Sequence, residues 1–304
     1  MTEKQAKLKI CSNCEYEFKD VNNYCPNCGQ KNHDLNIPLK HLLEEVIEST
    51  FHLDSKTLRT LKVLIFKPGY LSKEFNAGRR ANYVMPVRLY VMVSFIFFFL
   101  LSTFSSTHKN ETDLKNDLNP NKNKVNFSIN YGGISSNELA GFSLAQVDSL
   151  MNARGIANTN SNKYIYHQFY KIANSSSAEF MHLLMKNISY MMFILMPLFG
   201  LLIFIFNRKF LTYYIEGVII SVHFHSFTFL LSTIFLLFSY ALSRELFFFM
   251  GILIIPLYMY FMFKNIFEQR TGLTAFKTLI IGILYLSSLC FLMFLTVVIS
   301  MLII

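Results

Sequence analysis

Four of the five cysteines of the chain lie between residues 11 and 28. They form two C-x-x-C pairs, Cys11 with Cys14 and Cys25 with Cys28. Each pair can fold back through a tight turn and present two thiolates, and Zn²⁺ prefers four such soft ligands in a tetrahedron. Because cysteine fills all four positions, no coordination position is left open for water. The spacing therefore predicts a structural site whose cofactor is Zn²⁺, rather than a catalytic metal site.

Two disulfides or a redox-active pair are the alternatives for these cysteines. The chain orientation argued below places them in the reducing cytoplasm, which disfavours disulfides. No βαβ pattern surrounds either pair, as a thioredoxin-like pair requires. Gly29 permits a close turn after the second pair, but Glu15 stands at the corresponding place after the first, so we expect a looser first turn. Cys290 lies in an apolar run and reads as a small apolar side chain.

A second group with possible chemistry is Glu216, His223 and His225, which lie in a predicted membrane helix. Ionisable residues in such a helix suggest a functional site. Glu216 and His223 share a helix face, whereas His225 points about 200° away from His223. The functional interpretation is a proton or metal-ion site, with Tyr190 or Tyr258 as a further member. The alternative is neutral histidines that hydrogen-bond to neighbouring helices.

The elements that must carry these groups are mostly apolar helices. The chain has 304 residues, of which 53% are hydrophobic and 32 are Phe; this is too apolar for an ordinary soluble domain. Crossing about 30 Å of hydrocarbon takes ~20 helical residues. Five runs meet this requirement, the first and fourth being short, and none shows the alternation of a β-barrel strand. The runs are Leu89–Ser106, Ile188–Phe206, Gly217–Ala241, Leu246–Phe263 and Leu279–Ile304.

The predicted fold class is mainly α, an integral membrane helical bundle of about five transmembrane helices with a small N-terminal zinc ribbon. The predicted domains, in chain order, are a cytoplasmic zinc ribbon (1–33), amphipathic juxtamembrane helices (34–88), the first transmembrane helix (89–106), an extracytoplasmic Asn-rich loop that is partly disordered (107–186) and a four-helix transmembrane body (187–304).

The orientation follows from the basic residues beside the spans. Lys and Arg are concentrated ahead of the first span and in the loops after the second and fourth, the last holding Lys264, Arg270 and Lys277. The positive-inside rule then places the N-terminus in the cytoplasm and the C-terminus outside. The first 80 or so residues carry charge throughout, so we expect no signal peptide there. The net charge of +9 suits the basic inner face of a membrane protein, and nucleic acid is not an expected partner.

Residues 38–78 predict short amphipathic helices. Asp54 or Ser55 can cap one of them, Pro68-Gly69 ends it, and another spans Leu71–Ala77 and ends at Gly78. The apolar face of the capped helix is expected to carry Leu58, Leu61, Leu64 and Ile65. Four residues then border the first span and could bind lipid headgroups, the alternative being ordinary positive-inside anchoring: Arg79, Arg80, Tyr83 and Arg88.

The long loop after the first span is rich in Asn, Ser and Lys over residues 107–162. This composition is typical of partial disorder. One helix is predicted over Ser143–Arg154, with Ser143 as its cap and Gly155 as its stop, and another over residues 177–206. We interpret the loop as a tether, with binding of an external ligand as the alternative.

The order of these motifs resembles a bacterial, Bacteroidetes-type family of uncharacterised membrane proteins with an N-terminal four-cysteine zinc ribbon. The resemblance covers residues 11–106 and about 186–290, and implies a bacterial inner membrane location but no established activity. It rests, besides the cysteines, on Leu53-Asp54-Ser55, Thr57-Leu58, Lys67-Pro68-Gly69, the pattern G-R-R-x-x-Y-x-x-P-x-R over residues 78–88, Tyr213-Tyr214-Ile215-Glu216 and His223-Phe224-His225-Ser226-Phe227.

The function that these features favour is that of a non-enzymatic membrane scaffold or assembly factor. The chain has no Walker loop, G-x-S-x-G, H-E-x-x-H or paired-carboxylate motif, so we do not expect an enzyme. The expected partners are the lipid bilayer and a cytoplasmic protein bound through the ribbon. The alternatives are a small transporter or channel that uses the third membrane helix, and a membrane metal sensor.

Overall fold

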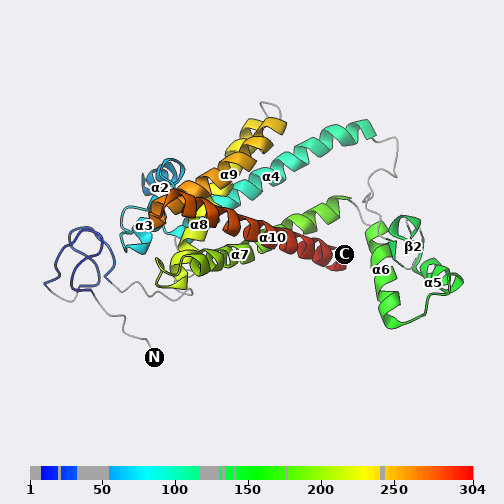
Figure 1. Ribbon diagram of the computed structural model, residues 1–304. Helices are drawn as coiled ribbons and strands as arrows, with labels where there is room; N and C mark the ends of the chain where they lie inside the picture. Colours follow the sequence, from blue (N-terminus) through cyan, green and yellow to red (C-terminus); the bar gives the residue numbers. More distant parts are fainter. Residues whose placement is uncertain are drawn as a thin grey trace. The chain divides into compact units, whose positions relative to one another are not determined.

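The computed structural model describes residues 8–19, 22–32, 55–116, 130–131, 134–139, 142–174, 177–239 and 244–303. The first part of the segment predicted to form amphipathic helices, residues 38–54, lies outside these residues. The described part is mainly helical (Figure 1). Its helices are α2 (Ser55–Phe66), α3 (Tyr70–Asn76), α4 (Pro86–Asn116), α5 (Leu144–Ala153), α6 (Asn160–Asn174), α7 (Ser177–Phe206), α8 (Tyr214–Ser239), α9 (Arg244–Phe267) and α10 (Thr271–Ile303).

Two compact units divide the chain. The first combines Met1–Ser106 with Met196–Tyr285, and the second combines Thr107–Leu195 with Leu286–Ile304. The first unit therefore contains the four cysteines, α2, α3, α8 and α9. The second contains a short hairpin of β1 (Asn130–Tyr131) and β2 (Ile134–Ser135), a 3₁₀ turn η1 (Ser136–Leu139), α5 and α6.

Among the residues that the structure describes, four helices are long and apolar enough to cross a membrane. Their spans, in α4, α7, α8 and α10, are Pro86–Phe104, Lys186–Phe206, Tyr214–Phe238 and Thr271–Ser300. The fourth predicted span, Leu246–Phe263, falls in α9, which contributes a shorter apolar stretch, Leu253–Phe267. Of the five predicted spans, four are therefore confirmed as span-capable helices within the part of the chain described.

The last span begins earlier than the sequence suggests. Helix α10 starts at Thr271 rather than at Leu279, so Lys277 lies inside the helix and not in a loop. The charge is tolerated there because Lys277 Nζ donates to Asn207 Oδ1 at 3.0 Å and lies 5.8 Å from the centre of the Phe210 ring. A lysine can keep its apolar stem in an apolar environment while its ammonium group reaches polar partners.

Helix α8 is the most enclosed of the four spans. In the apolar stretch of α8, 61% of the residues are buried, against 11% in the apolar stretch of α10. It packs against α2, α3 and α9, and it crosses α7 where two glycines meet. A Cβ atom on Gly217 would lie 2.5 Å from the carbonyl oxygen of Gly200. Small residues of this kind let two membrane helices approach backbone to backbone.

Helices α2 and α3 form a hairpin that packs on α9. Gly69 makes the turn with φ +82°, and a Cβ atom there would lie 2.7 Å from the carbonyl oxygen of Met262. Tyr258 O–H donates to the Leu64 carbonyl at 2.8 Å, and Asn265 Nδ2 donates to the Pro68 carbonyl at 2.9 Å. The hairpin is therefore hydrogen-bonded to the C-terminal half of α9.

The buried face of α2 differs from the prediction. Thr57, Thr60 and Leu64 are buried, whereas Leu58 is 68% exposed. The hydroxyl of Thr60 donates to Lys56 O at 2.7 Å and accepts the Val84 N–H at 3.1 Å. Because both hydrogen-bonding functions are satisfied, a threonine can occupy the face that hydrophobicity alone assigns to leucine.

The segment predicted to be partly disordered, residues 107–162, contains a folded part. Helices α5 and α6 and the η1 turn share a small core that includes Ile134, Leu139, Val147, Met151 and Tyr166. The predicted helix at 143–154 is confirmed as α5, with Ser143 N–H donating to Gln146 Oε1 at 2.7 Å and Gly155 at φ +69°. The long helix predicted from residue 177 to 206 is confirmed as α7. The helix α6 was not predicted.

Candidate metal centre and buried polar groups

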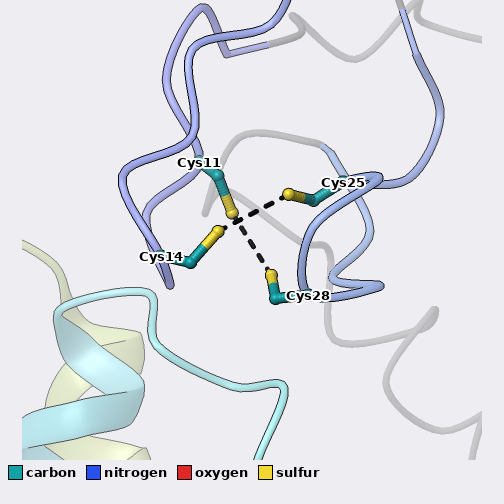
Figure 2. Close-up of side chains that lie close together, drawn as sticks. All are labelled: Cys11, Cys14, Cys25 and Cys28. Atoms are coloured by element: carbon teal, nitrogen blue, oxygen red, sulfur yellow. Dashed lines mark hydrogen bonds between the residues drawn. The ribbon is translucent and has the colours of Figure 1, made fainter.

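The four predicted cysteines converge on one point (Figure 2). Their Sγ atoms all lie within 4.8 Å of one another, and the Cys11–Cys28 and Cys14–Cys25 sulfurs are each 3.6 Å apart. Zn–S bonds of about 2.3 Å in a tetrahedron place sulfurs about 3.8 Å apart. The arrangement therefore fits a tetrahedral metal ion, and Zn²⁺ and iron are the ions that four thiolates select.

Two copies of one turn, fourteen residues apart, position the cysteines. In the first, Cys11 N–H donates to Tyr16 O and Glu15 N–H donates to Cys11 O, both at 2.9 Å. In the second, Cys25 N–H donates to Gln30 O at 2.7 Å and Gly29 N–H donates to Cys25 O at 2.9 Å. Short antiparallel bridges follow the same offset, Ile10 with Glu17 and Tyr24 with Lys31. The ribbon is thus a pseudo-symmetric pair of knuckles, each giving two ligands.

The first turn is not looser than the second, contrary to the expectation from Glu15. Gly29 has φ +72° and Glu15 has φ +60°, so both turns use the left-handed conformation. A side chain with a Cβ atom costs about 1 kcal/mol or more there. The hydrogen bonds of the knuckle and the positions of its two cysteines hold Glu15 in that conformation. The first turn is therefore strained and not loose.

The thiols do not ionise equally in the absence of a cation. Burial raises the pKa of Cys11 to about 12 and also raises the pKa of Cys28. A hydrogen bond from the backbone N–H of Tyr16 lowers the pKa of Cys14 to about 7. A bound dication reverses the effect of burial, because a coordinating thiol is deprotonated outright. This donor set suits a soft divalent ion.

Two residues that the sequence analysis did not single out complete the ribbon. Asn32 is buried and joins its two ends: Leu8 N–H donates to Asn32 Oδ1 at 3.0 Å, and Asn32 Nδ2 donates to Leu8 O at 3.3 Å and to Asn22 O at 3.2 Å. Gln30, directly after the second knuckle, reaches the juxtamembrane turn. The fourteen-residue offset pairs Gln30 with Tyr16 and Asn32 with Phe18, so the repeat gives no signal for these side-chain contacts.

The Gln30 side chain pairs with backbone groups of the G-R-R motif. Its Nε2 donates to Gly78 O at 2.8 Å, and its Oε1 accepts the Arg80 N–H at 3.1 Å. The Gln30 carbonyl oxygen meanwhile accepts the Cys25 N–H inside the knuckle. One residue therefore links the metal-binding turn to the segment that leads into α4.

The remaining residues of the predicted headgroup motif have structural contacts. The Arg79 guanidinium donates to both carboxylate oxygens of Glu74, at 2.6 and 2.8 Å. This bidentate pair raises the pKa of Arg79 and neutralises its charge locally. Tyr83 packs edge-on against Tyr70, and burial raises the pKa of Tyr83. Arg88 lies in the first turn of α4.

The structure gives Glu216, His223 and His225 separate partners. Glu216 Oε2 accepts the backbone N–H groups of Thr212 and Tyr213, at 2.7 and 3.3 Å, and so caps the start of α8. His223 Nδ1 and Ser72 Oγ are hydrogen-bonded at 3.0 Å. Among the described residues no partner reaches the buried His223 Nε2.

His225 faces another helix, as the 200° separation predicts. Its Nδ1 donates to the Ser221 carbonyl at 2.8 Å, so its Nε2 accepts the hydroxyl of Tyr285 at 3.0 Å. Neither tyrosine proposed from the sequence takes part: Tyr258 donates to Leu64, and Tyr190 is 58% exposed. The structure thus separates the three ionisable residues and adds Ser72 and Tyr285 as partners that are distant in the sequence.

Part of the chain matches a known protein family. Residues 54–98 match the family described as "Protein of unknown function (DUF3667)". The matched stretch contains α2, α3, the G-R-R motif and the first part of α4, and it excludes the cysteines. No curated protein and no solved structure matches the chain significantly.

Proposed function

We propose that the chain is a non-enzymatic integral membrane protein of the bacterial inner membrane, acting as a scaffold or assembly factor. Its N-terminus is cytoplasmic and its C-terminus extracytoplasmic. Helix α9 has 24 residues, which gives a length of about 36 Å, enough to complete five crossings. The observation that carries the proposal is the closed set of four thiols on a ribbon that is hydrogen-bonded to the juxtamembrane turn.

The ion in this proposal is Zn²⁺ in a structural role. Closed sites of four cysteines are the usual structural zinc sites, since no ligand position remains for water or substrate. A ribbon of about 25 residues buries too little apolar surface to fold unaided. Metal binding therefore supplies its folding free energy. The folded ribbon positions Gln30, whose hydrogen bonds then hold Gly78 and Arg80 in place.

The ribbon also presents a surface for a protein partner. Ile10 is 52% exposed and Tyr24 is 60% exposed, and the fourteen-residue offset relates the two positions. In this proposal the two exposed apolar side chains are the contacts that the partner covers. The pseudo-symmetry of the knuckles gives these side chains equivalent places in the two halves of the ribbon.

The test is co-purification of partners with the full chain from native membranes. The wild type is expected to carry one Zn per chain by elemental analysis and to retain a crosslinked cytoplasmic partner. Cys28→Ser should lose both, whereas the matched control Cys290→Ser, outside the ribbon, should lose neither. The double variant Ile10→Ser, Tyr24→Ser should keep the zinc and lose the partner. Retention of the partner by Cys28→Ser would refute the proposal.

A transporter or channel is the second candidate, favoured by the buried His223 Nε2. Proton or metal-ion flux into liposomes that His223→Ala abolishes would support that function over scaffolding. A metal sensor is distinguished by the exchange of its ion. Zinc that exchanges readily with free metal under native conditions would favour a sensor, and an inert ion would favour the structural role.

A further inference from the structure

The outward face of α2 combines exposed apolar side chains with basic ones. Leu58 is 68% exposed and Phe66 is 73% exposed, and Arg59 and Lys62 are exposed between them. At ~100° per residue these four positions fall on one side of the helix. Thr57, Thr60 and Leu64, on the opposite side, are buried. The helix therefore has one face packed on the protein and a second, amphipathic face that is exposed.

The charge of this face is of one sign. From Ser55 to Lys73 the chain contains five basic residues and no Asp or Glu. Lys73 forms an ion pair with Glu268, but Arg59 and Lys62 lie on the outward side of α2. Arg79, which the sequence suggested as a headgroup ligand, is paired with Glu74. The exposed basic surface of the hairpin is thus centred on α2 and not on the G-R-R motif.

Hydrogen bonds from α9 show which part of that helix lies beside α2. The carbonyl oxygens of Leu64 and Pro68 accept from Tyr258 and Asn265 of α9. Tyr258 precedes the last residue of α9 by nine positions, or about 14 Å of helix. The hairpin therefore lies beside the final turns of α9.

The neighbouring helix ends show the features of a membrane–water boundary. Tyr213 and Tyr214, at the start of α8, are 52% and 41% exposed, and tyrosines are enriched at that boundary. Arg208 and Lys209, which follow α7, and Lys264, near the end of α9, add positive charge. Amphipathic helices with a basic, apolar outer face bury that face 5–10 Å into the headgroup region.

We propose that the outward face of α2 is a binding surface for anionic phospholipid in the membrane leaflet that adjoins it. Leu58 and Phe66 enter the boundary between headgroups and acyl chains, and Arg59 and Lys62 contact the lipid phosphates. The inference rests on the proposed membrane-spanning body. An acidic protein surface would satisfy the two charges, but it would leave the two largest apolar side chains of this face without apolar contact.

The chain offers a direct probe, because it contains no Trp. Phe66→Trp and Leu58→Trp each place the single Trp of the protein on the outward face, where it can be excited selectively over the tyrosines. Each variant, monodisperse in detergent, is reconstituted as the full chain into nanodiscs of phosphatidylglycerol and phosphatidylcholine. One lipid or the other carries bromine atoms, which quench Trp on contact. Leu286→Trp on the exposed side of α10 is the lipid-facing control, and Tyr24→Trp in the ribbon is the water-facing control.

Both α2 variants should be quenched, and more strongly when the bromine is on phosphatidylglycerol. A basic residue near an anionic surface favours it about fivefold, so the preference for brominated phosphatidylglycerol should be severalfold. Adding Arg59→Gln and Lys62→Gln should remove that preference while leaving quenching by phosphatidylcholine in place. Equal quenching by the two lipids in the Phe66→Trp protein would overturn the anionic selectivity.

Two further outcomes separate the inference from the proposal beneath it. If Phe66→Trp and Leu58→Trp resemble Tyr24→Trp while Leu286→Trp is quenched, α2 is not in the interface although the protein spans the membrane. If Leu286→Trp itself is unquenched, the membrane-spanning body fails.

Discussion

The link between the four-cysteine ribbon and the turn at Gly78–Arg80 can be broken by one substitution, Gln30→Ala. The change removes two hydrogen bonds, to Gly78 O at 2.8 Å and from Arg80 N–H at 3.1 Å, and leaves the knuckle contact of the Gln30 backbone intact. Each such bond contributes about 0.5–1.5 kcal/mol. A loss of about 1–3 kcal/mol is therefore expected, which lowers the protection of the Arg80 amide roughly 5- to 150-fold.

Hydrogen exchange of the full chain in detergent or nanodiscs measures this directly. A peptide covering residues 77–85 reports on the Arg80 amide, and peptides of α8 report on the body of the protein. Gln30→Ala should accelerate exchange in the first and leave the second unchanged. Lys31→Ala is the matched control, because Lys31 is the exposed neighbour. Zinc content should be the same in all three proteins.

Stripping the metal should reproduce the effect of Gln30→Ala at the juxtamembrane turn, because the position of Gln30 depends on the knuckle. The two perturbations should not add in the Gln30→Ala protein. Unchanged exchange of Arg80 in Gln30→Ala would refute the contact. Protection of Arg80 that survives the loss of zinc would refute the coupling between the metal and the turn.

Three further substitutions test the packing. Gly217→Ala places a Cβ atom 2.5 Å from Gly200 O and should lower the free energy of unfolding by about 1–3 kcal/mol. The thermal unfolding midpoint in detergent should fall accordingly. Gly272→Ala, with no atom within 4 Å of its Cβ, is the control and should leave the midpoint unchanged. Asn207→Ala removes the acceptor of one lysine and one glutamine side chain and should cost about 1–3 kcal/mol in the same assay; an unchanged midpoint would contradict the contact. Glu15→Gly relieves a left-handed residue worth about 1 kcal/mol and should slow zinc release to a chelator, so faster release would count against strain at this turn.

The features that the sequence predicts correctly depend on local spacing. Two C-x-x-C pairs place four thiols within 4.8 Å because each knuckle is closed by hydrogen bonds within six residues. The cap of α5 and the left-handed Gly155 are local in the same sense. Helix α6 carries such a signal too: Tyr166, Phe169, Tyr170 and Ala173 follow helical spacing and contact one core. The polar composition of the segment concealed it.

The features that escape prediction join distant parts of the chain. Gln30 and Arg80 are 50 residues apart, and Ser72 and His223 are 151 apart. No periodicity states which backbone group a glutamine will meet, or which hydroxyl a buried histidine will find. The prediction of which face of α2 is buried was wrong for the same reason. The partner that allows Thr60 to be buried is the distant backbone amide of Val84. Hydrophobicity alone predicts that Leu58 is buried in preference to Thr60, and only the hydrogen-bond partner of Thr60 reverses that prediction.

The enclosure of α8 bears on the order in which the protein is assembled. Its two histidines receive their hydrogen bonds from segments made at different times. Ser72 is already synthesised when His223 emerges, but Tyr285 lies 60 residues beyond His225. At 5–20 residues per second, translation takes about 3–12 s to supply that phenol. The hydrogen bond that joins His225 of α8 to Tyr285 of α10 can therefore form only after α10 has been synthesised.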